Sequence, residues 1–366
     1  MAAAGAGVPV RMAGGNVKRA DAIPLRCIYS PASRHNRTQW DATRAFERGV
    51  AVLSFDTEQI WGHLDLLNEP QFQRRYPGAF LAHEKLLACL SSADISATWL
   101  VVGGMALAGS DGARDPRMAG LPIEWTGRIP AGRETTRPLW YRRTLVERLR
   151  AAHPHQEVGL HGGLTHLSWT ATHATPEVLK RELREGVIAL EQARVRPCSF
   201  SFPRDQEACH ELLPAQGIRC YRGRTPALSF ELGRTLPGAL LRILDELCVA
   251  TPPPVWPLES LPGLWNVPSS LFLYPIGRAR ARVAPVRTRI ERFRLGLDAA
   301  ICAQGVFHFC LHPDNLAESP EGFAMLEEIL DELVRRRACG DVEVLTMAEL
   351  ADRMESLREE PLAIQR

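Results

Sequence analysis

Four polar residues of catalytic type each stand directly after a short apolar segment of the chain. Asp56 follows VAVLSF, His161 follows EVGL, Arg204 follows CSFSFP, and His312 follows VFHFCL. One polar residue after a strand is ordinarily just a loop residue. In a parallel barrel, however, the carboxyl ends of all strands share one face, and the active site lies there. If these segments are parallel strands, the four residues converge on one site that combines a carboxylate, two imidazoles and a guanidinium.

The hydrophobic pattern of the rest of the chain is typical of an α/β protein. From residue 49, short and continuously apolar runs alternate with amphipathic stretches, as buried parallel strands separated by helices do. The expected strands are GVAVLSF (49–55), SATWLVVG (96–103), EVGL (157–160), CSFSF (198–202), IRCYRG (218–223), SSLFLYP (269–275), GVFHFCL (305–311) and VEVLTM (342–347). Helices are expected over 80–90, 139–153 and 283–304, after Thr175-Pro176, and after Ser319-Pro320, where hydroxyl caps precede proline.

Seven or eight such units favour one distorted, seven- or eight-stranded (β/α) barrel over about 300 residues. A doubly wound open sheet is the alternative, because periodicity does not reveal whether a sheet closes. We place the barrel domain over residues 46–355. Residues 1–45 are rich in Ala, Gly and Arg without a sustained period, so we expect a basic, disordered extension there.

Net charge, apolar runs and cysteine spacing indicate which classes of protein are disfavoured. The net charge of +2 is no general reason to expect nucleic acid. No run reaches the roughly 18 apolar residues of a transmembrane segment, and the N-terminal residues lack the apolar core of a signal peptide. The nine cysteines form no C-x-x-C pair, which is typical of buried free thiols in a reducing compartment. We therefore expect a cytoplasmic protein.

The order of these motifs resembles one known family, the polysaccharide deacetylases, which are carbohydrate esterases with a NodB homology domain. The resemblance spans residues 48 to about 350 and rests on the set as a whole. Its motifs are LSFDTEQIWG (53–62), SATWLVVG (96–103), EVGLHGGLTHLSW (157–169), FSFPRDQ (200–206) and HFCLHPDN (308–315).

The resemblance implies a role for each motif residue. Asp56 falls where the family has its catalytic base, which takes a proton from water. His161 and His166 fall on the metal-binding pair, and neutral imidazoles suit zinc. Arg204 falls on the arginine that orients the base and would keep it ionised. His312 falls on the general acid that protonates the departing amine.

Two departures from the family pattern concern the metal ligands. Many members have two adjacent acids in the first motif, the second of which binds the metal, but here Thr57 stands in that place. Glu58 is the nearest carboxylate, and we expect it to bind the metal instead. The common spacing of the histidine pair is four, whereas His161 and His166 are five apart. Two glycines directly after His161 would let the loop bend so that both rings converge.

The expected function is metal-dependent removal of an N-acyl group, with acetyl favoured, from an amino sugar or glycan, with zinc as the favoured divalent metal. "Sugar" comes from the resemblance alone; the residues indicate a metal with an acid and a base. Alternatives are the same chemistry on a non-sugar amide or N-formyl group, and a degenerate barrel that binds glycan without turnover. A nucleic-acid-associated protein using the basic tail and the arginines of 278–294 is disfavoured. His308 is expected in the core or behind the site residues, and Trp61 and Trp169 either stack on a sugar or lie buried.

Overall fold

The computed structural model describes residues 46–232, 235–275 and 284–359. Contacts divide the chain into two units, residues 1–40 and 41–366. All the described residues belong to the second unit. The extension expected over 1–45 lies outside the described residues, as does part of the arginine-rich segment 278–294.

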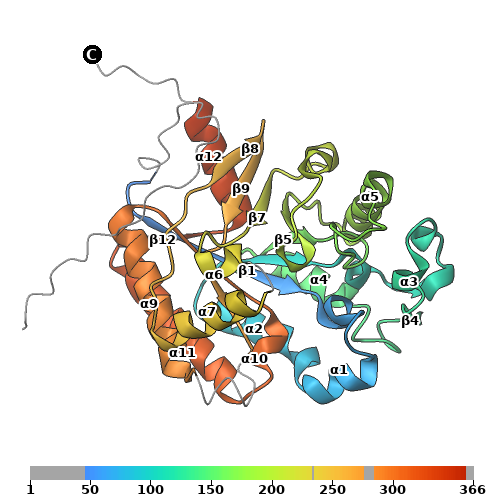
Figure 1. Ribbon diagram of the computed structural model, residues 1–366, viewed down its shortest axis with the longest axis horizontal. Helices are drawn as coiled ribbons and strands as arrows, with labels where there is room; N and C mark the ends of the chain where they lie inside the picture. The colour runs from blue at the N-terminus through green and yellow to red at the C-terminus, as the bar shows by residue number, and fades with distance from the viewer. Residues whose placement is uncertain (1–45, 233–234, 276–283, 360–366) are drawn as a thin grey trace, which may run out of the picture. The chain divides into compact units, whose positions relative to one another are not determined.

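A parallel sheet forms the centre of this unit (Figure 1). Its strands are β1 (Gly49–Thr57), β2 (Thr98–Val101), β5 (Glu157–His161), β6 (Ser199–Ser201), β7 (Cys220–Gly223), β8 (Leu258–Leu261), β9 (Leu264–Pro268), β10 (Leu271–Leu273), β11 (Val306–Leu311) and β12 (Val342–Leu345). The hydrogen-bonded order is β10-β11-β1-β2-β5-β6-β7-β9-β8, and β12 also pairs with β1. All these pairs are parallel except β8 with β9. All eight strands expected from the sequence are present.

The sheet curls on itself, and the chain between β9 and β10 links its two ends. These strands stand near opposite ends of the hydrogen-bonded order, yet only Ser269 and Ser270 separate them. The Ser269 N–H donates to the carbonyl of Gly223 in β7 (3.0 Å), and the Ser270 N–H donates to the carbonyl of His308 in β11 (2.8 Å). Two consecutive residues thus bridge the strands on either side. This confirms the distorted barrel and excludes the open doubly wound sheet.

Helices fill the connections between the strands. They are α1 (Glu69–Arg75), α2 (Ala79–Ser92), α3 (Ile123–Thr126), α4 (Arg143–Ala151), α5 (Pro176–Gln192), α6 (Leu228–Glu231), α7 (Leu236–Leu247), α9 (Val286–Ala303), α10 (Pro313–Leu316), α11 (Glu321–Ala338) and α12 (Met347–Glu359). Short 3-10 helices are η2 (Gln59–His63), η3 (Gly103–Ala106), η4 (Gly112–Arg114), η5 (Pro116–Met118), η6 (Pro203–Asp205), η7 (His210–Leu212) and η8 (Pro214–Gln216). The expected cap of α5 is present: Thr175 accepts from the Val178 N–H (3.4 Å) and Pro176 follows it.

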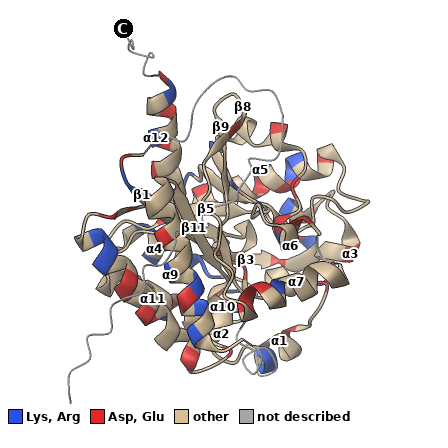
Figure 2. Cartoon of the chain, turned by 60° about the vertical axis from the view of Figure 1, so that its left-hand side comes forward, with Lys and Arg blue, Asp and Glu red and all other residues tan. Residues whose placement is uncertain are grey.

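Basic and acidic residues are interspersed along the outer helices (Figure 2). On α9 the apolar stripe Ile290, Phe293 and Leu297 is buried against the sheet, as its spacing predicts. Its arginines make contacts within the protein: Arg289 is buried and donates to the Tyr274 carbonyl, and Arg294 pairs with Glu328. No helix within the described ranges has both the length and the apolarity to cross a bilayer.

Two features depart from the sequence-based expectation. Residues 258–268, for which no strand is expected, form the hairpin β8–β9, with Gly263 in its turn at a φ of +74°. The region 104–138, expected to be a long loop, folds into short helical turns and the antiparallel pair β3 (Gly109–Asp111) and β4 (Ala131–Arg133). Both segments consist of elements too short to show a period.

The packing of α9 on the sheet yields a stability prediction. The ring centroid of buried Phe293 lies 5.1 Å from that of Phe307 and 5.2 Å from that of Phe309, and both of these residues are on β11. Phe293→Ala should lower the free energy of unfolding by about 3–5 kcal/mol, because it leaves a cavity between helix and sheet. Arg287→Ala, on the exposed side of the same helix, should change it by less than about 0.5 kcal/mol. Urea unfolding compares the two, and equal losses would contradict this packing.

Candidate active site

Two buried carboxylates stand at the carboxyl end of β1. Asp56 and Glu58 are 3% and 4% exposed, although each is charged at neutral pH when free. Residues two apart in an extended chain point to the same side, so both face the inside of the rim. Thr57 points elsewhere, and its hydroxyl donates to the Phe55 carbonyl (3.3 Å). This alternation explains why the second acid comes two residues after the first and not next to it.

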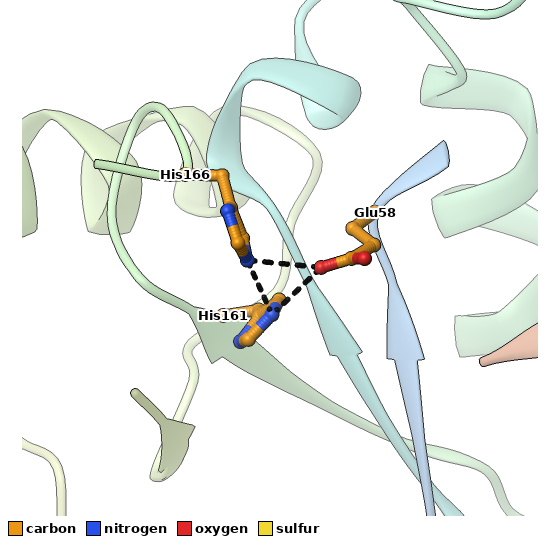
Figure 3. Close-up of side chains that lie close together, drawn as sticks. All are labelled: Glu58, His161 and His166. Carbon is orange, nitrogen blue, oxygen red and sulfur yellow. Dashed lines mark hydrogen bonds and ion pairs between the residues drawn. The ribbon is translucent and has the colours of Figure 1, made fainter. Parts of the chain in front are cut away.

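Glu58 meets the histidine pair in one buried cluster (Figure 3). The Glu58 Oε2 atom lies 3.0 Å from His161 Nε2 and 2.9 Å from His166 Nε2, and the two Nε2 atoms are 3.1 Å apart. His161 ends β5, and His166 reaches back from the loop that follows. Gly162, at a φ of +75°, makes the bend that brings the rings together across a spacing of five.

The chemistry of this donor set fits a divalent metal. His161 Nδ1 lies 3.1 Å from the Ser201 carbonyl oxygen, which can only accept a hydrogen bond. When Nδ1 carries the single ring proton, the lone pair of Nε2 faces a carboxylate oxygen 3.0 Å away, an arrangement that a cation between the two atoms would stabilise. Burial lowers the pKa of His166 despite the opposing charge of Glu58, so that ring is neutral at pH 7. Two imidazoles and one carboxylate are a common three-ligand set for catalytic zinc.

A buried arginine compensates the other carboxylate, but it is Arg222 and not Arg204. Arg222 Nη1 and Nη2 donate to Asp56 Oδ1 and Oδ2, both at 2.7 Å. Burial raises the pKa of Asp56, but the charge of Arg222 and further cationic contacts outweigh it and hold that pKa well below its usual range. Arg204 instead pairs with Asp65, with both side chains partly exposed. The contact with Asp56 that was expected of Arg204 is therefore made by Arg222.

The local backbone explains why Arg222, and not Arg204, contacts Asp56. Arg204 falls in η6, where its φ of +60° turns it out of line with β6. Arg222 lies within β7 and is 3% exposed. A charged residue inside a buried strand is a signal in its own right, because such a group must be paired. The segment IRCYRG carries that signal, although the pattern of polar residues after strand ends does not point to Arg222.

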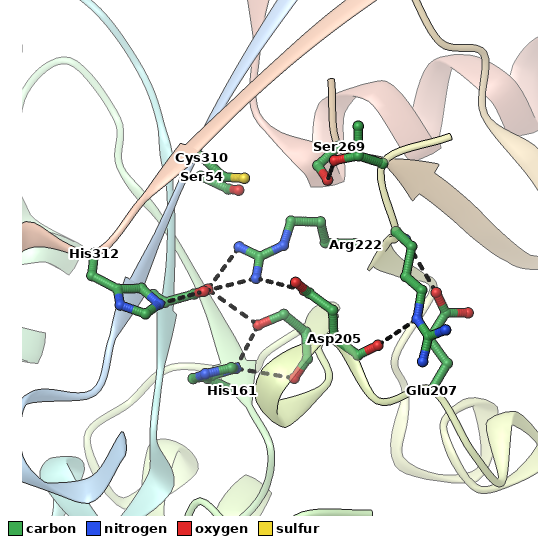
Figure 4. A network of polar contacts seen from close by, with 12 residues as sticks. Ser54, His161, Asp205, Glu207, Arg222, Ser269, Cys310 and His312 are labelled. Carbon is green, nitrogen blue, oxygen red and sulfur yellow. Dashed lines mark hydrogen bonds and ion pairs between the residues drawn. The ribbon is translucent and has the colours of Figure 1, made fainter. Parts of the chain in front are cut away.

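His312 contacts both carboxylates, and Figure 4 shows it in the polar network that also contains Arg222 and His161. Its Nε2 is 3.2 Å from Asp56 Oδ2 and its Nδ1 is 3.6 Å from Glu58 Oε1. Burial lowers the pKa of His312, but the charge of Glu58 and the contact with Asp56 outweigh this and raise it to about 9. The imidazole is therefore protonated at neutral pH in the metal-free chain. Its side chain is 27% exposed, which leaves it accessible from solvent.

The remaining candidates belong to the interior. His308 is fully buried, with Nε2 2.8 Å from the Ser54 hydroxyl. Trp61 is buried, and its indole N–H donates to the Trp140 carbonyl (2.7 Å). Trp169 is also buried, and its ring packs against aromatic rings of the core. None of the three offers a surface to a sugar.

The donor cluster predicts how the chain binds metal. After removal of metal with a chelator, the protein should bind about one zinc ion per chain. Glu58→Ala and His161→Ala should each weaken binding by more than about 100-fold, which exceeds the usual effect of losing a partner outside the ligand set. His173→Ala, in an exposed loop, is the control. Competition with a chromophoric chelator measures the affinity, and undiminished zinc binding by both variants would place the site elsewhere.

The two arginines should differ in their contribution to stability. Arg222→Met removes the bidentate partner of buried Asp56 and leaves it only the ion pair with His312, so it should lower the free energy of unfolding by about 3–5 kcal/mol at pH 7. Arg204→Met removes a partly exposed pair and should cost less than about 1 kcal/mol. Because the pKa of Asp56 is lowered by folding, its contribution is present above the unfolded value and is lost as the pH falls. The difference between wild type and Arg222→Met should therefore shrink below about pH 4. Urea unfolding at about pH 7 and about pH 3.5 tests this, and a constant difference would count against it.

Comparisons with known proteins bear on the fold. No family model matches the chain, and no curated protein matches it either. Among solved structures, a protein from Mycobacterium smegmatis described as a polysaccharide deacetylase is 19% identical, with 87% of this chain and 95% of that one aligned at a TM-score of 0.55. Puue allantoinase is 10% identical (90% and 96% aligned, TM-score 0.52). A protein from Pseudomonas aeruginosa PAO1 described as a polysaccharide deacetylase is 11% identical (85% and 92% aligned, TM-score 0.51). The described domain thus has the fold of the polysaccharide deacetylase structures.

Proposed function

We propose that this chain is a metal-dependent hydrolase that removes an N-acyl group, acetyl in the first instance, from an amino sugar or glycan. One observation carries the proposal. The buried set Glu58, His161 and His166 adjoins a charged carboxylate, Asp56, and a protonated imidazole, His312, which contacts both acids. A metal-ligand set, a base and an acid within one rim are the parts that hydrolysis of an amide requires.

Asp56 is the base in this proposal. Arg222 donates to both carboxylate oxygens, and Oδ2 also contacts His312 Nε2. Among the described residues, Oδ1 has only one other contact, the long one from the Ser201 hydroxyl (3.5 Å), so it is the oxygen placed to accept a proton. The low pKa keeps Asp56 ionised but also makes it a weak base. A divalent ion, zinc in our proposal, would lower the pKa of water and polarise the amide carbonyl, and so compensate for that weakness. Asp56 then takes one proton from the attacking water.

His312 is the acid. Water adds its oxygen to the acyl carbon, the C–N bond breaks, and the nitrogen leaves as an amine that needs a proton. In the metal-free chain, Glu58 and Asp56 raise the pKa of His312 to about 9. In our proposal, the contact with Asp56 supports the protonated ring that supplies this proton. The contact with Asp56 Oδ2 holds the ring and gives the two groups a path for returning the proton. The products are a carboxylic acid and an amine.

The sugar part of the proposal rests on the resemblance of the motifs and on two neighbours of this fold described as polysaccharide deacetylases. An allantoinase has the same fold, so the fold itself does not select a sugar, and a non-sugar amide is the second candidate. The assembled donor set argues against a barrel that only binds glycan. The cytoplasmic location expected from the sequence remains a prediction.

Loss of the base should reduce turnover and leave binding intact. Asp56→Asn keeps the shape of the side chain but removes its charge, so it should lower kcat by at least about 100-fold on an N-acetylated amino sugar. Asp65→Asn is the matched control, since it also removes a carboxylate from an arginine pair. Acetate release from zinc-loaded protein measures kcat. No acetate release by wild type from any N-acetylated sugar, with retained glycan binding, would favour the binding protein.

Loss of the acid should depend on the leaving group. His312→Ala should slow hydrolysis of an amide far more than that of an activated ester, because an ester's good leaving group needs little protonation. The measurement is kcat on both substrates for wild type and variant. Equal slowing of amide and ester would mean that His312 has a structural role.

A further inference from the structure

The two histidines of the donor cluster are held in different ways. His161 Nδ1 is fixed by Ser201, whose carbonyl lies at 3.1 Å and whose hydroxyl lies at 2.6 Å. Such a partner on the second ring nitrogen orients a metal-binding histidine. His166 Nδ1 is buried and has no hydrogen-bond partner among the described residues. Apart from the contacts of Nε2 within the cluster, its ring is therefore positioned by the backbone that carries it.

That backbone is held by one residue of α5. Glu182, which is fully buried, accepts from the Thr165 N–H (2.6 Å) and the Thr165 hydroxyl (2.5 Å) through the same oxygen, Oε1. The main-chain carbonyl of Glu182 accepts from the Leu164 N–H (2.9 Å). Glu182 thus binds the two residues that directly precede His166, with both its side chain and its main chain.

Close backbone contact fixes the rest of the loop. A Cβ on Gly163 would meet the Glu182 carbonyl oxygen at 2.6 Å, and one on Gly186 would meet the Gly163 carbonyl carbon at 2.4 Å. From the other side, the N–H of Gly103 donates to the Gly163 carbonyl (2.8 Å). The loop therefore lies between α5 and η3, with no room for a side chain at these positions.

The hydrogen bonds of the Thr165 hydroxyl show that the side chain at position 182 must be an acceptor. The Trp125 indole N–H can only donate, and it donates to Thr165 Oγ1 (2.8 Å). The Leu167 N–H donates to the same oxygen (3.2 Å). The hydroxyl proton of Thr165 is then free only for Glu182, which must act as an acceptor. An uncharged amide oxygen would serve equally well, but an apolar side chain would not.

We propose that Glu182 is a positioning residue of the donor cluster, which acts through Thr165 to set where His166 stands relative to Glu58 and His161. This inference rests on the proposed metal site. It explains how His161 and His166, five residues apart, can still meet in a compact cluster. The loop between them accommodates the extra residue, and contacts with α5 outside the site fix the conformation of that loop. Glu182 itself touches neither the donors nor the catalytic pair.

The test compares three variants of the full chain. Glu182→Leu removes the acceptor with little change in volume, Glu182→Gln keeps it, and Glu185→Leu makes the same change one turn away. Glu185 is also buried on α5, but its side chain bonds to Arg184. Glu182→Leu should weaken binding of zinc alone by about 10- to 100-fold. Glu182→Gln and Glu185→Leu should bind zinc like wild type, whatever they do to the melting temperature.

A second readout in the metal-free chain separates this proposal from the metal site itself. With histidines labelled for NMR, Glu182→Leu should shift or broaden the ring signals of His166 more than those of His161. A folded Glu182→Leu protein with wild-type zinc affinity and an unchanged His166 signal would overturn the proposal. If wild type binds no zinc, the proposed function fails, and the NMR comparison still decides whether Glu182 positions His166. If Glu182→Leu does not fold, Thr165→Val, against Thr165→Ser, replaces it with the same expected directions.

Discussion

The burial of two carboxylates, two residues apart at the end of β1, is the constraint on which the rest of the site depends. An isolated ionised carboxylate in a protein interior costs far more free energy than a domain can supply, so it must be paired or become protonated. Asp56 has Arg222 and His312, and Glu58 has His161, His166 and His312. These contacts lower the pKa of both acids against the opposing effect of burial. The partners come from three separate parts of the chain, around residues 161–166, 222 and 312, so the charges of β1 can be stable only when the whole rim is assembled.

The closure of the sheet brings those partners together. β5 lies two strands from β1 and carries His161, β7 lies two strands further and carries Arg222, and β11 on the other side of β1 leads to His312. The parallel register places all these strand ends on one rim. The bridge at Ser269 and Ser270 holds β7 and β11 to one another. A flat sheet with the same strand order would leave Arg222 too far from Asp56 to pair with it. Curvature is thus a requirement of the electrostatics as well as of the packing.

The residues of the site are held in two ways, some by the strands that carry them and one, His166, by contacts outside the site. Asp56, His161 and Arg222 belong to strands, and the ring of His161 is fixed by Ser201. His166 comes from a loop, and its support passes through Thr165 to Glu182 on α5 and to Trp125 in the region between β2 and β5. A loop ligand can tolerate a change in spacing, such as the five residues here, provided that its outer contacts hold it. Metal binding at the proposed site would therefore depend on residues well outside the donor set.

Local sequence properties were sufficient to predict the eight strands of the barrel, the capped start of α5, the buried stripe of α9, and the strand ends at Asp56, His161 and His312. Those properties are continuous apolar runs, helical periodicity and the polar residue that comes after a strand. The assignments of Glu58, His161 and His166 as ligands and of Asp56 and His312 as catalytic residues came from the family resemblance, and the geometry is compatible with them. Which arginine faces Asp56 depends on tertiary structure, because the left-handed φ at Arg204 and the strand register at Arg222 arise from contacts between distant segments. The closure of the sheet through the chain that follows β9, and the support of His166 by Glu182, also depend on contacts between distant segments. A sequence pattern records which side chains are buried or exposed, but it does not record which buried groups meet across a closed sheet.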